Sequence, residues 1–281
     1  MATYSISQGN LKIDGANAEQ ILSTNTGGKF AKKPGIVVIH FTAGGSARSS
    51  AEWFRSPQNR NSSAHVVIER DGTIIQCVNF EKIAWHAGRS SWHGLIGLNQ
   101  YSIGIELANW GNLRSADGGW VTSTGKRIAE PFLGTHRNGN PDGSTHPIGW
   151  EPYPEEQVAA ARGLVEALIG AYAISEIVGH DDIAPVRKSD PGPAFNMSRF
   201  RTALLNPRNE DGDNTGTVAS ANGLNLRSGP GTHFPAIVSL KNKAVVQLLG
   251  NDGVWLQVTS LDGQGRPDKT GWVHSHYVRL G

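Results

Sequence analysis

The chain has 281 residues, of which 38% are hydrophobic, and a formal net charge of +2. This length is enough for one large domain or two smaller ones, and the near-neutral charge gives no electrostatic case for nucleic-acid binding. The single cysteine, Cys77, excludes an intramolecular disulfide framework. No apolar run approaches the ~20 residues of a membrane span, so we expect no membrane segment.

Three stretches in the first half of the chain have the patterns of β-strands. Residues 35–43, GIVVIHFTA, form an apolar run rich in β-branched residues, which predicts a buried central strand. Residues 63–78 predict two strands around a turn at Asp71-Gly72. Residues 102–110, SIGIELANW, predict a further strand.

Two stretches have helical spacing, residues 46–56 and residues 154–173. The second opens with a proline and two glutamates, as expected at a helix N-terminus. Because strand and helix patterns alternate, we expect an α/β domain with a central mixed β-sheet flanked by helices. Residues 111–153 are rich in glycine, proline and polar residues, and a loop of this length is usually functional or flexible.

The pattern changes after a polar, acidic segment, residues 206–216, which we interpret as a linker. Residues 217–281 contain short β-type runs separated by Gly, Pro and Asn-Asp-Gly turns, without a helical period. This pattern predicts a small all-β barrel. We therefore expect one domain over residues 1–205 and a second over residues 217–281.

Three residues in the first domain have the side chains of a metal site. His40 ends the apolar strand, so its ring is expected to point into a cleft at that edge; His180 and Asp190 lie ten residues apart on a proline-rich segment that we do not expect to be helical. Two imidazoles and one carboxylate, with a fourth position open, are a ligand set of catalytic zinc. Each residue also fits a structural role, so the spacing alone leaves both interpretations open.

Six segments of the chain, in order, resemble the zinc-dependent N-acetylmuramoyl-L-alanine amidases of the amidase-2 type, which share the fold of peptidoglycan-recognition proteins. They are IVVIHFTAG, SAHVVIERDGTIIQCV, AWHAGRSSW, NQYSIGIELAN, YPEEQVAAARGLV and GHDDIAPVRKSDPGPAF, and they extend over roughly residues 35–201. The last segment is the most specific, because His180 is followed by Lys188 eight positions on and by Asp190 two further.

The resemblance implies one Zn²⁺ ion held by His40, His180 and Asp190, with Glu106 and Lys188 as catalytic residues. Glu106 would accept a proton from water and deliver it to the leaving amine, and Lys188 would stabilise the oxyanion. The implied reaction cleaves the amide between the lactyl group of N-acetylmuramic acid and L-alanine, in peptidoglycan or muropeptides. A non-catalytic peptidoglycan-binding protein of the same fold is the alternative.

Several further residues lie in or near the matching segments. His65 is a candidate for the cleft or for the core, and His86 for lining the site or orienting a metal ligand. Arg89 is a candidate partner for a stem-peptide carboxylate. Asn109 is a candidate for sugar or peptide contacts, together with Trp85 and Trp110.

Other polar residues of this domain have simpler expectations. His136 and His146 belong to the long loop and are expected to be exposed. Asp181 and Asp182 are expected to stabilise a turn or to hold the tautomer of His180. Cys77 lies in the middle of a strand, where a small buried residue is expected, so a thiol hydrolase is disfavoured.

Residues 217–280 resemble a bacterial SH3-like domain, on the basis of LNLRSGPG, a later Trp and the terminal GWVHSHYV. Such modules commonly bind cell-wall peptides, and the mild basic excess of this segment suits an anionic wall polymer; a purely structural barrel is the alternative. The N-terminus shows no signal peptide, so we expect cytoplasmic synthesis, with export lacking a cleaved signal left open. Nothing in the sequence indicates the oligomeric state.

Overall fold

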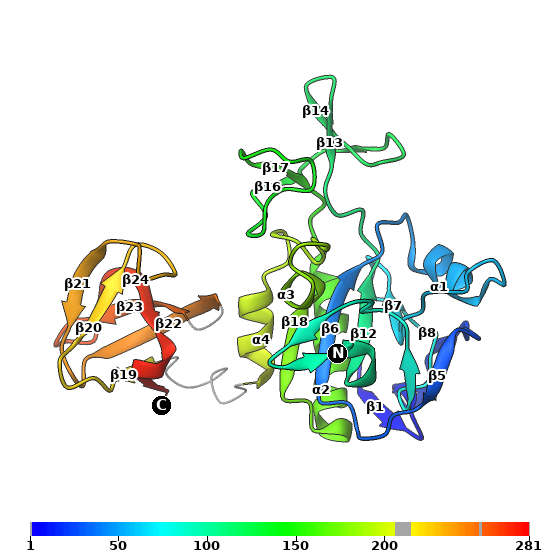
Figure 1. Ribbon diagram of the computed structural model, residues 1–281, viewed down its shortest axis with the longest axis horizontal. Helices are drawn as coiled ribbons and strands as arrows, with labels where there is room; N and C mark the ends of the chain where they lie inside the picture. Colours follow the sequence, from blue (N-terminus) through cyan, green and yellow to red (C-terminus); the bar gives the residue numbers. More distant parts are fainter. Residues whose placement is uncertain (1, 206–214, 253–254, 281) are drawn as a thin grey trace. The chain divides into compact units, whose positions relative to one another are not determined.

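The computed structural model describes residues 2–205, 215–252 and 255–280. The chain divides into two compact units, Met1–Asn196 and Met197–Gly281 (Figure 1). Helix α4 (Met197–Leu205) therefore groups with the second unit. Most of the predicted linker lies outside the described residues, and its last two residues begin the first strand of the second unit.

The first unit is built on a six-stranded mixed sheet in the order β18-β6-β12-β7-β8-β4 (Figure 1). The four strands β18, β6, β12 and β7 are parallel, and β7 and β8 form the predicted antiparallel hairpin. This confirms the mixed central sheet. The bounds of the strands are β4 (Glu19–Gln20), β6 (Ile36–Phe41), β7 (Val66–Ile68), β8 (Ile74–Gln76), β12 (Ser102–Leu107) and β18 (Glu176–Gly179).

The register of the three neighbouring parallel strands brings polar residues together. Glu106 of β12 lies opposite His40 of β6. Gly179 of β18 lies opposite Ile39, so the next residues, His180 and His40, are also neighbours. Because side chains alternate along a strand, Glu106 and His40 face the same side of the sheet, at the carboxyl ends of the strands. Ligand sites of open α/β sheets lie outside this end of the strands.

Both predicted helices are present. Helix α1 (Ala47–Arg55) begins after Ser46, whose side chain accepts a hydrogen bond from the Ser49 N–H and so caps the helix. Its apolar residues pack in a buried cluster with strand residues that include Val67, the neighbour of Glu106 in the sheet. Helix α1 thus covers the face of the sheet that carries Glu106.

Helix α2 (Glu155–Tyr172) begins after Pro154, with Glu155 and Glu156 in its first turn, as predicted. The buried side chain of Gln157 donates hydrogen bonds to the carbonyl oxygens of Ile68 and Ala108, at the ends of β7 and β12. These bonds fix the start of the helix to the same edge of the sheet.

The stretch predicted as a long loop contains short β-structure instead. It forms a three-stranded sheet and a hairpin that project from the edge of the main sheet (Figure 1). Strands of two or three residues are too short to leave a period in the sequence. The strands are β13 (Arg114–Ala116), β14 (Gly119–Val121), β15 (Arg127–Ile128), β16 (Phe132–Gly134) and β17 (Ile148–Trp150).

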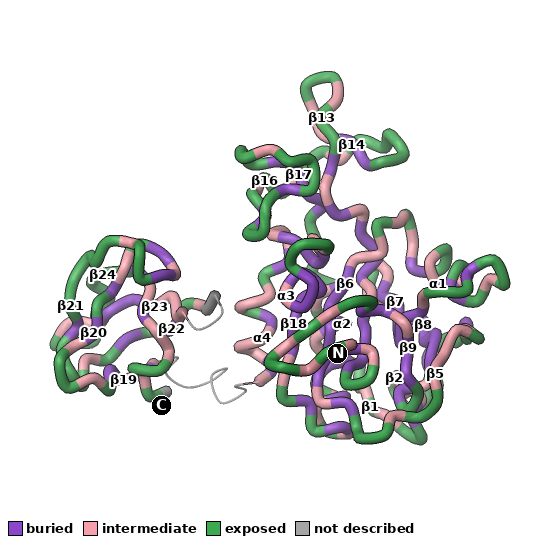
Figure 2. Tube along the Cα trace, viewed as in Figure 1, coloured by how far each residue is buried: buried purple, intermediate pink, exposed green. Residues whose placement is uncertain are grey.

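Smaller elements complete the first unit, and buried residues run along its central strands β6 and β18 (Figure 2). Among the described residues of the chain, none of the helices has the length and hydrophobicity needed to cross a bilayer. The smaller elements are β1 (Tyr4–Ser7), β2 (Asn10–Ile13), β3 (Ala16–Asn17), β5 (Thr26–Lys29), β9 (Lys82–Ala84), β10 (Ser91–Trp92), β11 (Leu95–Ile96) and η1 (Leu98–Gln100).

The second unit contains a seven-stranded antiparallel sheet in the order β21-β20-β24-β23-β22-β19-β25, which confirms the all-β prediction. Its buried core includes Val218, Leu226, Val258 and Val273. The elements are β19 (Thr215–Val218), β20 (Leu224–Arg227), β21 (Ala236–Leu240), β22 (Val245–Asp252), β23 (Trp255–Leu261), β24 (Pro267–His274), η3 (Ser275–Tyr277) and β25 (Val278–Leu280).

Candidate metal centre

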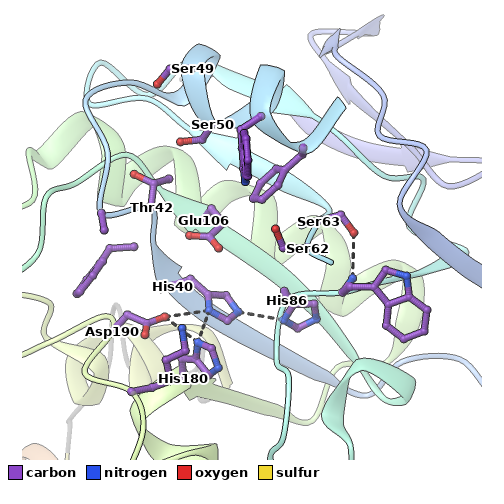
Figure 3. Close-up of a pocket in the computed structure, with 16 residues that line it drawn as sticks. His40, Thr42, Ser49, Ser50, Ser62, Ser63, His86, Glu106, His180 and Asp190 are labelled. Carbon is purple, nitrogen blue, oxygen red and sulfur yellow. Dashed lines mark hydrogen bonds and ion pairs between the residues drawn. The ribbon is translucent and has the colours of Figure 1, made fainter. Parts of the chain in front are cut away.

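Three buried side chains converge at the carboxyl ends of β6 and β18 (Figure 3). They are His40 in β6, His180 at the start of the four-residue helix α3 (His180–Ile183), and Asp190 in the loop that follows. Nδ1 of His40, Nδ1 of His180 and Oδ2 of Asp190 lie 2.9 Å from one another in every pair. The structure thus brings together the three residues that the resemblance implied as metal ligands.

The short helix α3 differs from the prediction that this proline-rich segment is not helical. It ends at Ile183, ahead of Pro185, so the prolines limit its length without preventing its start. The Asp182 carboxylate accepts a hydrogen bond from the Gly179 N–H at 2.7 Å and closes the first turn. Asp182 therefore stabilises the turn, one of the two roles expected for it.

The tautomer of His180 is set on the side of the ring that faces away from the centre. Its Nε2 lies 3.1 Å from the carbonyl oxygen of Ala87. A carbonyl can only accept, so Nε2 carries the hydrogen. Nδ1 therefore presents a lone pair to the centre, as a metal ligand requires.

The tautomer of His40 is set through His86. The Ser102 hydroxyl donates to the Leu98 carbonyl at 2.6 Å, so its oxygen and the Ser102 carbonyl are left to accept from His86 Nε2, at 3.3 and 3.4 Å. His86 Nδ1 is then an acceptor, and it lies 3.0 Å from His40 Nε2. His40 Nε2 carries the hydrogen, and its Nδ1 also presents a lone pair inward.

Three acceptors therefore face one another with no proton between them, and only a cation satisfies all three. Burial, followed by the influence of His180, lowers the pKa of His40 to about 4, so its ring is neutral at pH 7. The candidate ligand atoms all lie within 4.8 Å of one another, near enough to share one ion.

Glu106 lies beside the three ligands and shares their pocket (Figure 3). Its Oε2 atom is buried and has no hydrogen-bond partner among the described residues. Burial, and next the charge of Asp190, raise the pKa of Glu106 well above its usual value, and Lys188 acts in the opposite direction. A raised pKa makes the carboxylate a stronger proton acceptor, which suits a role as a general base.

The pocket is a cleft of about 430 Å³. The three candidate ligands, Glu106 and the half-buried Lys188 are among the residues that line it. Ser49, Ser50 and Trp53 of α1 also line it, and Trp53 is 52% exposed. The sequence interpretation missed these three residues. The helical spacing of the apolar residues Ala47, Ala51 and Phe54, which are buried, could have indicated that Ser49, Ser50 and Trp53 lie on other faces of the helix. Further polar and aromatic lining comes from residues that include Thr42, Ser62, Ser63 and Trp85.

The four residues predicted as substrate contacts lie in different environments, and not all of them line the cleft. His86 lines the cleft and orients His40. The exposed Arg89 is outside the lining of this cleft, and its carbonyl oxygen accepts a hydrogen bond from Arg187. Asn109 is fully buried, donates to the Glu151 carbonyl and accepts from the Gly111 N–H. Asn109 therefore shapes the backbone after β12, and Trp110 is likewise outside the cleft lining.

The fourth predicted contact, His65, lies in the core. Its Nε2 lies 2.9 Å from the Lys82 carbonyl oxygen, and its Nδ1 accepts a hydrogen bond from the Gly104 N–H. The rings of Phe30, Phe80 and His86 lie around it. His65 is opposite Gly104, one pleat deeper in the sheet than Glu106, which explains why it shares the face of the site but not its surface.

The buried His65 predicts a loss of stability in acid. Burial lowers its pKa from 6.5 to about 4, with the Lys82 carbonyl acting in the opposite direction. Between these values the unfolded chain binds a proton that the folded chain does not, so stability falls as the pH falls. From pH 7 to pH 5 the contribution of His65 amounts to about 2 kcal/mol. Denaturant unfolding at both pH values should show that His65→Gln loses about 2 kcal/mol less than the wild type. Equal losses would contradict the prediction.

The exposure of His136 and His146, two residues of the projecting stretch, can be compared with the prediction that both are exposed. His146 is exposed, as predicted, whereas the prediction that His136 is exposed is wrong. His136 Nε2 lies 3.0 Å from Oδ2 of the buried Asp181, and Arg137 bridges Asp181 and Asp182. The partner of His136 lies 45 residues later in the chain, so no local pattern reveals it. Asp181 thus anchors the projecting stretch to α3 rather than holding the imidazole of His180.

Cys77 is buried in the cluster beneath α1. Burial, followed by the charge of Glu106, raises the pKa of its thiol to about 12. The thiolate is the nucleophilic form of cysteine, so Cys77 is not a nucleophile at neutral pH. This agrees with the expectation of a small buried residue.

Comparisons with known proteins agree with this geometry. The family model for N-acetylmuramoyl-L-alanine amidases matches residues 30–193, and the model for the bacterial SH3 domain matches residues 222–279. The 1,6-anhydro-N-acetylmuramyl-L-alanine amidase AmpD of Enterobacter cloacae is 38% identical over 144 residues, which cover 50% of this chain and 57% of AmpD. The N-acetylmuramoyl-L-alanine amidase AmiD of Escherichia coli (strain K12) is 33% identical over 169 residues, which cover 57% of this chain and 49% of AmiD.

Solved structures that match part of the chain include a selenomethionine derivative of AmpD, with 29% sequence identity and a TM-score of 0.49 over 71% of this chain and 98% of that one. The chain spans about half the length of the curated relatives named above. Because the amidase family model covers residues 30–193, more than half of the 281 residues, the chain belongs to the N-acetylmuramoyl-L-alanine amidase family and has a bacterial SH3 domain in its second unit.

Proposed function

We propose that this protein is a zinc-dependent N-acetylmuramoyl-L-alanine amidase, which hydrolyses the amide bond between N-acetylmuramic acid and L-alanine. The observation that carries the proposal is the convergence of three inward-facing lone pairs beside a carboxyl oxygen of Glu106 that has no partner in the described part of the chain. Two imidazoles and one carboxylate form a three-ligand set with a fourth position open, which is typical of catalytic zinc. Family membership supports the same assignment.

Each polar residue of the cleft has a task in amide hydrolysis. A bound zinc ion supplies a Lewis acid, which polarises a carbonyl and makes water a better nucleophile at neutral pH. Glu106 accepts the proton that water loses and passes it to the nitrogen of the leaving amine. The ammonium group of Lys188, which lines the same pocket, stabilises the negative charge that develops on the carbonyl oxygen. The C–N bond breaks as water gives its oxygen and one hydrogen to the new carboxyl group and its other proton to the amine nitrogen.

The same observations disfavour a non-catalytic binding protein of this fold. Binding alone does not need a buried carboxyl oxygen without a partner, which destabilises the folded chain. Nor does it need three acceptors placed together, since these repel one another until a cation is present. Both features are retained here, and both are explained by proton transfer beside a metal ion.

We propose muropeptides or peptidoglycan as the substrate. One solved structure with 26% identity and a TM-score of 0.42 over 68% of this chain and 62% of that one is AmiD in complex with anhydro-N-acetylmuramic acid-L-Ala-D-γ-Glu-L-Lys. The hydroxyl groups of Ser49 and Ser50 and the exposed indole of Trp53 fit the hydroxyl groups and ring face of an amino sugar.

Digestion of purified sacculi and of soluble anhydromuropeptides by the full-length protein tests the proposal. Mass spectrometry should detect free stem peptides that begin with L-alanine, together with the unsubstituted lactyl carboxyl group on the sugar. A chelator should abolish the reaction, and added Zn²⁺ should restore it. Binding without these products, or activity that survives removal of the metal, would refute the proposal.

A further inference from the structure

One short segment contacts both imidazoles of the candidate metal centre, through the His86 side chain and the Ala87 carbonyl group. We call residues 86–89 the strap. We propose that Asn99 and Arg187 are positioning residues, which hold the strap in place and thereby keep His40 and His180 oriented for the metal. The inference rests on the proposed function, because the orientation of these rings matters only if the site binds a metal ion.

The strap contacts each ring at the nitrogen that faces away from the centre. His86 Nδ1 lies 3.0 Å from His40 Nε2, and the Ala87 carbonyl oxygen lies 3.1 Å from His180 Nε2. Neighbouring residues thus set both tautomers. A displacement of the strap would turn both ligands at once, which makes the groups that anchor it important for the metal site.

Asn99 anchors the strap through its backbone N–H groups. Asn99 Oδ1 accepts hydrogen bonds from the His86 N–H at 3.0 Å and from the Ala87 N–H at 2.8 Å. Asn99 lies in η1, directly ahead of β12, so it ties the strap to the central sheet. An aspartate at this position keeps the oxygen acceptor, whereas an alanine removes it.

Arg187 anchors the strap through its carbonyl groups. Nη2 of Arg187 lies 2.9 Å from the carbonyl oxygens of both Ala87 and Arg89. The Ala87 oxygen is the same atom that accepts from His180 Nε2, so the guanidinium group and the imidazole share one acceptor. Arg187 also directly precedes Lys188, so the bond ties the strap to the segment that carries this residue.

The backbone of the strap fits closely around the guanidinium group. Gly88 has a φ of +56°, in the left-handed region that favours glycine. A Cβ at Gly88 would lie 3.2 Å from Nη2 of Arg187. His86 itself lies over Gly104, where a Cβ would lie 2.4 Å from the His86 ring. Both ring and guanidinium group therefore occupy space that side chains at these glycines would fill.

The test is the zinc dissociation constant of full-length variants, measured by competition with a chromophoric chelator. Arg187→Ala and Asn99→Ala should each bind Zn²⁺ about 10–100-fold more weakly than the wild type, the range for groups that orient metal ligands. Asn99→Asp should restore most of the affinity. The absorption spectrum of Co²⁺-substituted protein should change in both alanine variants, since it reports ligand geometry rather than stability.

Arg70→Ala is the matched control. Arg70 makes a two-bond pair with Glu151 and donates to the Gly45 carbonyl, and none of its partners belongs to the strap. Its loss should reduce stability and leave the zinc affinity within twofold of the wild type. Wild-type zinc affinity in both Arg187→Ala and Asn99→Ala would overturn the positioning role and leave the amidase proposal standing. A wild-type protein that binds no zinc would overturn both.

Discussion

Replacing Asp190 by alanine is expected to abolish zinc binding and amide hydrolysis together. Asp190 is the only anionic member of the three-ligand set, and its Oδ2 atom lies 2.9 Å from the inward nitrogens of both His40 and His180. Without it, two neutral imidazoles remain, and their affinity for a divalent cation is much lower. Since groups that only orient a ligand contribute 10–100-fold, loss of a ligand should weaken zinc binding by more than about 100-fold.

Metal content after dialysis and product formation from muropeptides measure this effect. Asp181→Asn is the matched control, because Asp181 is another buried carboxylate in contact with an imidazole, but its partner is His136. This variant should lose stability and keep its zinc. An Asp190→Ala protein that retains stoichiometric zinc and normal turnover would show that the three groups do not act as a metal site.

Glu106→Gln is expected to keep the metal and lose turnover. Glutamine has nearly the shape of glutamate but cannot accept a proton, so the transfer from water to the leaving amine fails. General acid–base catalysis contributes about 10²–10⁴-fold, and we expect kcat to fall by that factor. Because burial and the charge of Asp190 disfavour an ionised Glu106, the neutral amide should leave the free energy of unfolding unchanged or slightly higher.

Zinc content, kcat and denaturant unfolding of the same Glu106→Gln preparation give the result. Full zinc occupancy with a loss of turnover assigns Glu106 to proton transfer, whereas a parallel loss of zinc would assign it to metal binding. Turnover within tenfold of the wild type would exclude the role proposed for it. Together with Asp190→Ala, this variant separates metal loading from the chemical step.

The sequence predicted most of the fold that carries the site. The strands around His40 and Glu106, the hairpin at Asp71-Gly72 and both helices have strong local patterns, and each is present. The projecting strands of two or three residues are too short for such patterns. The helix α3 was missed because its four residues precede the prolines that argued against a helix.

The site itself was predictable only through the resemblance. The spacing of these residues in the sequence did not decide whether they bind a metal. His40 and His180 are 140 residues apart, and only the pairing of β18 with β6 makes them neighbours. The position of a residue within a matching segment also does not show how deeply its side chain is buried. His65 and Asn109 lie in matching segments, yet both are fully buried and bonded to backbone groups. Trp53 lies in the cleft through the packing of α1, which no local pattern specifies.

The parallel register of β18, β6 and β12 sets the distances between the functional side chains that these strands carry. A slip of one residue in either pairing would send one functional side chain to the opposite face, and the apolar core formed by the same strands prevents such a slip. Amide hydrogens of β6 should exchange with solvent only when the whole N-terminal unit unfolds, and the reacting geometry should persist until that event.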